Sequence, residues 1–267
     1  METEMAADGD DLKGKLILVT GGGSGVGRAA CLLLAEGSAR VVVADINLAA
    51  ALETQRNLKN ADEHLALHMD VSLSASVNEA AIKIEEHFGA VPCGLVHCAA
   101  IVIVDETRES SLQCTEGDWD RVIQVNLKGT FLVNTVFTRL MRDRHLHSGS
   151  VVNVSSLARH GYPPFIDYSA SKAGVVGITK TLASELGQFN IRVNAVSPAM
   201  VRTPMLATAP PIILKKSADS NPLRRLAEAE EVARVCVFLL KSASSYVNGQ
   251  VIGVDGGETK LVCRYDY

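Results

Sequence analysis

The chain has 267 residues, of which 47% are hydrophobic and 21% are charged, and its formal net charge is −4. This composition is typical of a soluble globular protein, and the length fits one large α/β domain. Lys and Arg form no cluster, which argues against a nucleic-acid partner or an anionic membrane surface. No apolar run reaches the roughly 20 residues that span a bilayer.

The chain ends and the cysteines favour a cytoplasmic protein. The acidic, polar stretch from Met1 to Asp11 lacks the basic and apolar regions of a signal peptide. The last residues match neither a prenylation box nor a peroxisomal signal. The 6 cysteines form no C-x-x-C pair, and no His stands at zinc-ligand spacing from them. We therefore expect reduced thiols and no metal site.

Short apolar runs alternate with longer helical stretches along the whole chain. The predicted strands are Leu16–Val19, Val41–Ala44, Leu65–Met69, Gly94–Cys98, Ser150–Val154, Ile191–Val196 and Gly249–Val254. The predicted helices are Arg28–Gly37, Leu48–Leu58, Ser74–Phe88, Trp119–Met141, Tyr168–Phe189 and Ala227–Leu240. Strands that are apolar throughout indicate a parallel sheet covered on both faces. We predict one domain over residues 1–267, a Rossmann-like, doubly wound parallel sheet of about seven strands in three α/β/α layers.

A glycine-rich turn, Thr20-Gly21-Gly22-Gly23-Ser24-Gly25-Val26-Gly27, follows the first predicted strand. Glycine allows a tight turn and lets a pyrophosphate approach the N-terminus of the next helix. The spacing is T-G-x-x-x-G-x-G rather than the commoner G-x-G-x-x-G. Its place directly after a strand predicts a dinucleotide site at Gly21, Gly25 and Gly27.

Two aspartates end the second and third predicted strands. A carboxylate at Asp45 can bind both adenosine ribose hydroxyls and repels a 2′-phosphate, and no Arg or Lys immediately follows it. This favours NAD over NADP, although Asp45 could instead cap the next helix. Asp70 could accept a hydrogen bond from the adenine amino group or serve as a turn residue, and both readings stay open.

From Lys13 to Gly257 the chain resembles the single-domain branch of the short-chain dehydrogenase/reductase family. The resemblance rests on the turn, Asp45 and Asp70, followed in order by Asn126-Leu127-Lys128-Gly129, Ser155-Ser156, Tyr168-x-x-x-Lys172, and Ser197-Pro198 with Thr203. It implies a nicotinamide cofactor, an Asn-Ser-Tyr-Lys catalytic set, and dimers or tetramers assembled through the two helices Trp119–Met141 and Tyr168–Phe189. The chain departs from the family at His97-Cys98-Ala99-Ala100, where Asn-Asn-Ala-Gly is common, and at Ala199, where many relatives have Gly.

Tyr168 and Lys172 are the predicted centre of the chemistry. Hydride transfer at a carbinol carbon needs a proton transfer at its oxygen, and Tyr168 suits this role. Lys172 lies one helical turn later, so its charge can lower a phenol pKa that is ordinarily about 10. The resemblance implies that Ser156 binds the substrate oxygen and that Asn126 holds a water near Lys172.

The choice between two adjacent serines depends on how the alignment is made. The usual distance to the tyrosine selects Ser155, whereas the strand register selects Ser156 with one residue deleted from the following loop. We choose Ser156, because strand register determines the face to which a side chain points. The resemblance also assigns cofactor contacts to Ser24, Val26, Val71, Asn126, Tyr168, Lys172, Val201 and Thr203.

Apolar residues dominate the stretch from Ala199 to Pro222, interpreted as a loop–helix flap, and the loop after Ser156. They predict a hydrophobic secondary alcohol or ketone as substrate, such as an alicyclic, terpenoid or steroid-like compound. They could instead pack against neighbouring subunits, and Arg159 and His160 leave room for a polar contact. The alternatives are a 3-oxoacyl thioester reductase that uses NADP, which Asp45 opposes, and a non-catalytic dinucleotide sensor, which the full catalytic set opposes.

Overall fold

The computed structural model describes residues 11–104, 108–146, 148–207 and 209–259. In this part of the chain, one sheet of seven parallel strands has the order β3-β2-β1-β4-β5-β6-β9. The strands are β1 (Leu16–Thr20), β2 (Arg40–Asp45), β3 (Leu65–His68), β4 (Gly94–His97), β5 (Gly149–Val154), β6 (Ile191–Pro198) and β9 (Val251–Val254). The predicted Rossmann-like fold is confirmed. The predictions about the two chain ends concern residues that lie almost entirely outside the described ranges.

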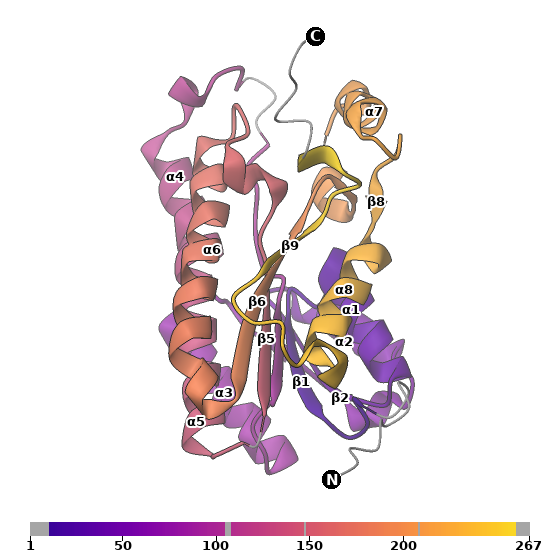
Figure 1. Cartoon of the computed structure of the whole chain (residues 1–267), viewed down its shortest axis with the longest axis vertical. Coiled ribbons are helices and arrows are strands. Elements are labelled where there is room, and N and C mark those ends of the chain that lie inside the picture. Colours follow the sequence, from indigo (N-terminus) through magenta and orange to yellow (C-terminus); the bar gives the residue numbers. More distant parts are fainter. Residues whose placement is uncertain (1–10, 105–107, 147, 208, 260–267) are drawn as a thin grey trace.

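Helices cover both faces of the sheet and form the outer layers (Figure 1). One face carries α1 (Gly25–Glu36), α2 (Leu48–Arg56) and α8 (Ala229–Leu240). The other carries α3 (Ser74–Phe88), α5 (Gly129–Asp143) and α6 (Ile166–Leu186), with α4 (Glu116–Val122) packed against α6. The apolar character of the strands follows from this arrangement, because neither face of the sheet meets water.

Strand β1 shows how the two cores divide the side chains. Ile17 and Val19 belong to the core beneath α1 and α8. Leu16 and Leu18 belong to the core beneath α3 and α5. Successive strand residues point to opposite faces, so the same alternation decides the direction of polar side chains at the strand ends.

The predicted helix from Trp119 to Met141 is interrupted in the structure. It consists of α4, a π-helical turn from Ile123 to Lys128, and α5. A π turn adds one residue without breaking the apolar periodicity strongly, so the sequence pattern did not reveal it. The turn contains Asn126, and π turns often occur at functional sites. Helix α1 begins at Gly25 and α6 at Ile166, earlier than the predicted Arg28 and Tyr168.

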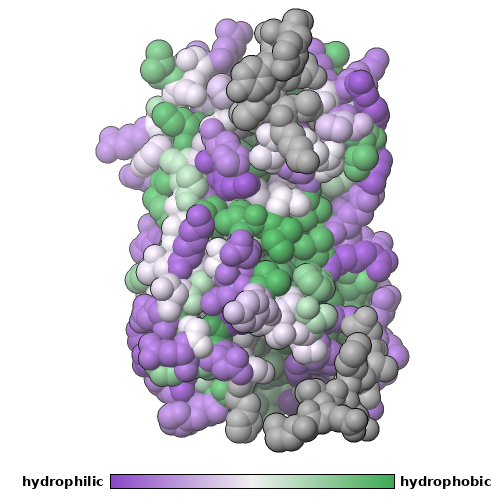
Figure 2. Space-filling view, viewed as in Figure 1, coloured by the Kyte–Doolittle hydropathy of each residue, from purple (hydrophilic) through white to green (hydrophobic). Residues whose placement is uncertain are grey.

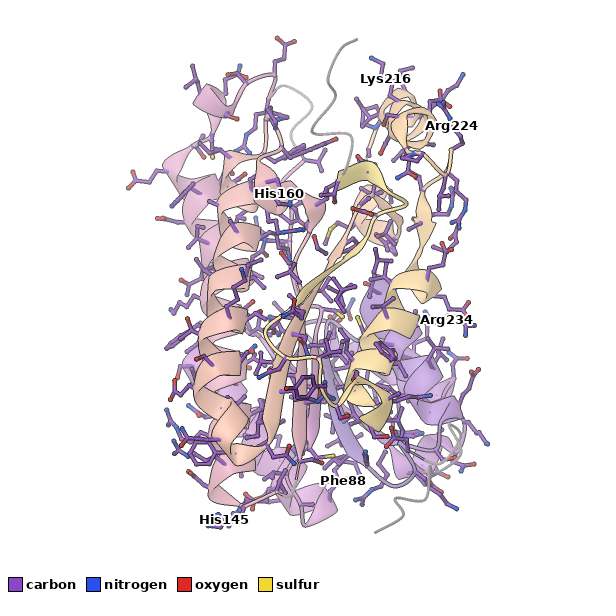
Figure 3. All side chains as sticks on the ribbon, viewed as in Figure 1. Phe88, His145, His160, Lys216, Arg224 and Arg234 are labelled. Carbon is purple, nitrogen blue, oxygen red and sulfur yellow. The ribbon has the colours of Figure 1, made fainter. Side chains whose placement is uncertain are left out.

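The predicted flap contains regular structure. After β6 the chain forms the short strand β7 (Val201–Arg202), which pairs with β8 (Ala227–Glu228), and the helix α7 (Pro211–Ser220). In Figure 3, His160 of the loop after β5 and Lys216 of α7 lie toward one end of the molecule. Phe88, the last residue of α3, and His145, which follows α5, lie at the opposite end. The flap and the loop after β5 therefore share the end at which the strands finish.

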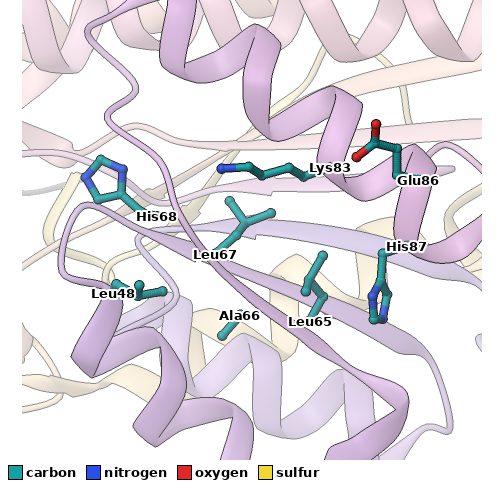
Figure 4. A pocket seen from close by; sticks show the side chains of 8 residues that line it. All are labelled: Leu48, Leu65, Ala66, Leu67, His68, Lys83, Glu86 and His87. Carbon is teal, nitrogen blue, oxygen red and sulfur yellow. The ribbon is translucent and has the colours of Figure 1, made fainter.

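A groove of about 520 Å³ runs along the edge strand β3, between the start of α2 and the last turns of α3 (Figure 4). None of the predicted site residues lines it. Within the described ranges, no cluster of His, Cys, Asp and Glu could hold a metal ion, and no helix is long and apolar enough to cross a membrane. Several predicted site residues instead lie at strand ends: Asp45 ends β2, and Ser155 and Ser156 follow β5.

Candidate active site

The turn between β1 and α1 leaves no room for side chains at several of its glycines. A Cβ on Gly27 would lie 2.1 Å from the carbonyl oxygen of Gly21, inside van der Waals contact. Gly21 has a φ of +66°, and its Cβ would lie 2.9 Å from the backbone nitrogen of Ala99. A Cβ on Gly25 would meet the methyl group of Thr203 at 3.2 Å. The turn therefore packs against the chain after β4 and the first residues of the flap.

Two further predicted cofactor residues lie at the start of α1. Ser24 is the N-cap of α1, and Val26 lies in its first turn. Val201 begins β7, two residues before Thr203. The N-terminus of α1 lies at the end of the sheet where strand β1 finishes. An α-helix N-terminus with its backbone N–H groups free is a favourable place for a phosphate.

The Asp45 carboxylate lies beside the glycine turn. Its Oδ2 accepts a hydrogen bond from the Gly23 N–H at 2.9 Å, and its Oδ1 accepts one from the Asn47 N–H at 2.9 Å. The cap of α2 is Asn47, whose side chain accepts the Ala50 N–H at 3.2 Å. Asp45 is thus oriented by the turn rather than used as a helix cap.

Asp70 forms a local turn directly after β3. Its Oδ1 accepts the Ser72 N–H at 2.9 Å and the Ser72 hydroxyl at 2.6 Å. The neighbouring Val71 is buried against Gly129, where a Cβ would come within 2.8 Å of Val71 Cγ2. These contacts fit the interpretation of Asp70 as a turn residue. A role of Asp70 in adenine binding stays a prediction.

Tyr168 and Lys172 lie one turn apart on α6, where Lys172 is buried and Tyr168 is half-buried. The Lys172 ammonium is 5.6 Å from the centre of the Tyr168 ring and donates to the Val154 carbonyl at 2.8 Å. Burial lowers the pKa of Lys172 to about 8. Burial raises the pKa of Tyr168, and a hydrogen bond with Ser156 opposes this rise. Lys172 and Ser156 thus both lie near the Tyr168 ring.

The two candidate serines directly follow β5 and have different contacts. Ser155 is 1% exposed, and its hydroxyl donates to the Lys172 carbonyl at 2.8 Å. The Ser156 Oγ accepts the Ala158 N–H at 3.1 Å, and Ser156 lies near enough to Tyr168 to lower the pKa of its phenol. The register of β5 therefore places Ser156, and not Ser155, beside the phenol.

Asn126 connects the chain after β4 to α6, the helix that carries Tyr168 and Lys172. Its side-chain oxygen accepts the Ile101 N–H at 2.8 Å, and its amide nitrogen donates to the Ile101 carbonyl at 2.8 Å. The same nitrogen donates to the Ser171 hydroxyl at 3.1 Å, next to Lys172 in the chain. The Asn126 side chain is engaged by protein atoms, so a water held at this residue stays a prediction.

His97 replaces the asparagine that is common in the family, and its role was not predicted from the sequence. Its Nδ1 lies 2.8 Å from the Thr20 hydroxyl, at the first residue of the glycine motif. Its Nε2 is buried without a hydrogen-bond partner, and burial lowers the pKa of His97 to about 3. A neutral imidazole thus joins the ends of β1 and β4. The departure from the family pattern was the signal that pointed to this position.

The buried ion pair between Arg108 and Asp167 was also missed. The two side chains are 2% and 1% exposed, and their closest charged atoms are 3.1 Å apart. No motif marks Arg108, which lies in the long connection between β4 and α4. Only its contact with Asp167, the residue before Tyr168, connects it with the site.

The chain is similar to known oxidoreductases over most of its length. A family model described as enoyl-(acyl carrier protein) reductase matches residues 21–259. The chain is 41% identical to the 3-oxoacyl-acyl-carrier-protein reductase FabG of Thermotoga maritima, over 92% of this chain and 98% of the other. It is 38% identical to the human (3R)-3-hydroxyacyl-CoA dehydrogenase, over 92% and 96%. The crystal structure of levodione reductase, 33% identical, superimposes with a TM-score of 0.83 over 93% of this chain and 99% of that one.

Fold, family model and relatives define an oxidoreductase that acts on CH–OH or keto groups with a nicotinamide cofactor. The chain belongs to the short-chain dehydrogenase/reductase family. The match covers the glycine turn, the strand ends and the flap together. The predicted family is therefore confirmed.

Proposed function

We propose that this protein interconverts a hydrophobic secondary alcohol and its ketone with NAD(H), using Tyr168 as the acid/base group. The observation that carries the proposal is the convergence of Ser156 and Lys172 on Tyr168. The nicotinamide would accept hydride from the alcohol or donate it to the ketone. The residues of the chain would manage the proton and the charge on the substrate oxygen.

Each of the three residues has a separate role in this scheme. Tyr168 takes the hydroxyl proton in the oxidation direction and returns it in the reduction direction. The Lys172 ammonium favours the phenolate form of Tyr168, because an opposite charge nearby stabilises an ionised group. The Ser156 hydroxyl donates a hydrogen bond to the substrate oxygen as negative charge develops there. Asn126 holds α6, the helix that carries Tyr168 and Lys172, against the chain after β4.

The residues around the glycine turn fit a dinucleotide. The space at Gly21 and Gly27 that a Cβ would fill brings the backbone within reach of a pyrophosphate. We assign the adenosine ribose hydroxyls to Asp45, whose carboxylate disfavours a 2′-phosphate. Within the described ranges, Asp45 takes part in none of the ion pairs. The remaining contacts would come from Ser24, Val26, Asp70, Val71, Val201 and Thr203.

Exposed apolar side chains near the site support an apolar substrate. Met205, Ile212 and Ile213 of the flap are exposed, as are Tyr162 and Ile166, which precede Tyr168 in the chain. Large apolar groups that remain open to water at the rim of a site favour an apolar ligand. Packing against another subunit would cover them equally well, so the substrate panel below is the deciding test.

A second candidate is the same chemistry at carbon 3 of an acyl thioester. It is favoured by the names of two relatives, a 3-oxoacyl-acyl-carrier-protein reductase and a (3R)-3-hydroxyacyl-CoA dehydrogenase. An apolar acyl chain would also suit the exposed residues of the flap. The two candidates differ in the group that follows the ketone, which a kinetic panel can vary directly.

The panel compares a bulky alicyclic ketone, a 3-oxoacyl thioester and a small sugar, each with NADH and with NADPH. The main proposal expects the highest kcat/KM with the alicyclic ketone and NADH. A clear preference for the thioester supports the second candidate. Faster turnover of the small sugar contradicts both. Cofactor binding without turnover of any alcohol or ketone supports the dinucleotide sensor instead.

Replacing Tyr168 by Phe tests the acid/base assignment. Loss of the proton-transferring hydroxyl is expected to lower kcat by about 100-fold to 10,000-fold. NADH affinity, measured by fluorescence titration, should change little because the ring is retained. The control is Tyr246→Phe, since Tyr246 is fully exposed and should leave kcat unchanged. Retention of most of the activity by Tyr168→Phe contradicts the assignment.

Replacing Asp45 by Asn tests the cofactor assignment. The amide can still accept the Gly23 N–H, but it no longer repels a 2′-phosphate. The ratio of kcat/KM for NAD to that for NADP is expected to fall by about tenfold, equivalent to about 1.4 kcal/mol. The measurement is steady-state kinetics with both cofactors. A wild-type preference for NADP would overturn the assignment.

A further inference from the structure

Arg108 lies at the centre of a charged group just outside the catalytic residues. Its Nη1 donates to both Asp167 oxygens, at 3.1 Å and 3.3 Å. Its Nη2 donates to Asp118 Oδ2 of α4 at 3.2 Å. Arg108 and Asp167 are almost fully buried, whereas the Asp118 side chain is 32% exposed. One guanidinium therefore joins the chain after β4, helix α4 and the first turn of α6.

Asp167 in turn holds the backbone of Tyr168. The first N–H groups of a helix have no acceptor within the helix and need one from elsewhere. The N-cap of α6, Phe165, provides no side-chain acceptor. Asp167 Oδ1 accepts the Tyr168 N–H at 2.9 Å and fills this gap. The ion pair with Arg108 keeps this carboxylate in place.

The clamp at Tyr168 has a counterpart one helical turn further along α6. There, Asn126 joins Ile101 to Ser171, the residue before Lys172. Both clamps connect α6 to the chain that follows β4. The stretch of α6 that carries Tyr168 and Lys172 is thus held at both ends. Arg108 acts near Tyr168, and Asn126 acts near Lys172.

A buried ion pair is a weak source of stability, because removing two charges from water offsets most of their attraction. A role in geometry explains the pair better than a role in stability. We propose that Arg108 is a positioning residue for Tyr168, which it orients through Asp167. The proposal rests on the proposed acid/base role of Tyr168. A reacting group displaced by about 1 Å can lose about 100-fold in rate.

The kinetic test uses Arg108→Gln, Arg108→Lys and a matched control. Arg108→Gln is expected to lower kcat per NADH-binding site by about 10-fold to 100-fold, with KM and NADH affinity nearly unchanged. Arg108→Lys keeps the charge and should recover part of kcat. Arg144→Gln removes a similar ion pair, with Glu85, from an exposed surface and should leave kcat unchanged. In a Tyr168→Phe background, Arg108→Gln should cause no further loss.

A second measurement does not depend on turnover. Arg108→Gln should speed hydrogen exchange in a peptide that contains the first turn of α6, because the Tyr168 amide loses its oriented acceptor. A peptide from α1 should exchange at the wild-type rate. If the wild-type protein turns over no alcohol or ketone, the proposed function fails, and this exchange difference alone decides whether Arg108 holds Tyr168.

Three results would overturn the positioning role. The first is an Arg108→Gln variant with wild-type kcat and wild-type exchange in the first turn of α6. The second is a parallel fall of kcat and NADH affinity, which would indicate a general disturbance of the fold. The third is faster exchange throughout the chain rather than in α6 alone. Titration of the NADH-binding sites gives the concentration of folded protein in each preparation. A lower kcat per binding site then cannot be caused by a smaller folded fraction.

Discussion

At the scale of single residues, the site retains charged and polar groups in an environment that disfavours them. Lys172 is 3% exposed, and its ammonium has the Val154 carbonyl as hydrogen-bond partner. His97 is 2% exposed and leaves its Nε2 without a partner. Burying such groups costs free energy of folding, and sites of chemistry commonly carry this cost. The stability of the protein should therefore depend on these residues in a predictable way.

Lys172→Met is expected to raise stability at neutral pH while abolishing turnover. The folded-state pKa of Lys172, about 8, lies below its unfolded value of about 10.4. Between these values the unfolded chain binds more protons, so wild-type stability rises with pH in that window. From pH 7 to pH 10.5, the wild-type free energy of unfolding should gain about 3 kcal/mol relative to the variant.

Urea denaturation of both proteins at the two pH values measures this change. The methionine side chain fills similar space without a charge, so packing should change little. An equal difference in unfolding free energy at pH 7 and at pH 10.5 would show that burial does not depress the pKa of Lys172.

At the scale of elements, the glycine turn and the π turn show where local pattern is informative and where it is not. The glycine motif follows a strand and precedes a helix, so its conformation could be predicted from neighbouring residues. The π turn that contains Asn126 interrupts a helix whose residues keep an apolar periodicity. Asn126 in this turn contacts Ile101 and Ser171, which are distant in the sequence and which a local pattern does not contain.

Two glycine-to-alanine substitutions test whether the turn is as crowded as its geometry indicates. A Cβ on Gly27 would lie 2.1 Å from the Gly21 carbonyl, so Gly27→Ala is expected to cost about 3 kcal/mol or more and to weaken NADH binding. A Cβ on Gly117 of α4 would meet no atom closer than 4.0 Å. Gly117→Ala should be neutral or stabilising by up to about 1 kcal/mol. Chemical denaturation with NADH titration compares them, and equal losses would contradict the argument.

At the scale of the whole molecule, several large apolar side chains of the described residues remain exposed. Trp119 of α4 and Phe131 of α5 are exposed, as is Phe189 just after α6. Strand β9 lies at the edge of the sheet, and Figure 2 shows an apolar area in the middle of the face where this strand lies. Exposed apolar areas of this kind favour association. We propose that the chain forms a dimer or a tetramer through these surfaces.

Phe131→Glu tests this assembly. A charge in the middle of an apolar interface is expected to shift the protein to a smaller species, because burying it unpaired costs several kcal/mol. Ile82→Glu is the control, since Ile82 is similarly exposed but lies on α3, outside the proposed interface. Light scattering coupled to size exclusion gives the mass of each variant. A wild-type monomer, or a Phe131→Glu variant of wild-type mass, would contradict the proposal.

The sequence by itself determined the α/β class, the strand positions within a few residues, the glycine turn and the pair Tyr168 and Lys172. These features depend on neighbours in the chain or on one helical turn, so local patterns contain them. Only the tertiary structure decided which serine lies beside Tyr168, that Asn126 sits in a π turn, and that Arg108 reaches Asp167. The reason is physical: Arg108 and Asp167 are separated by 59 positions in the chain, and only the packed sheet and helices bring them into contact.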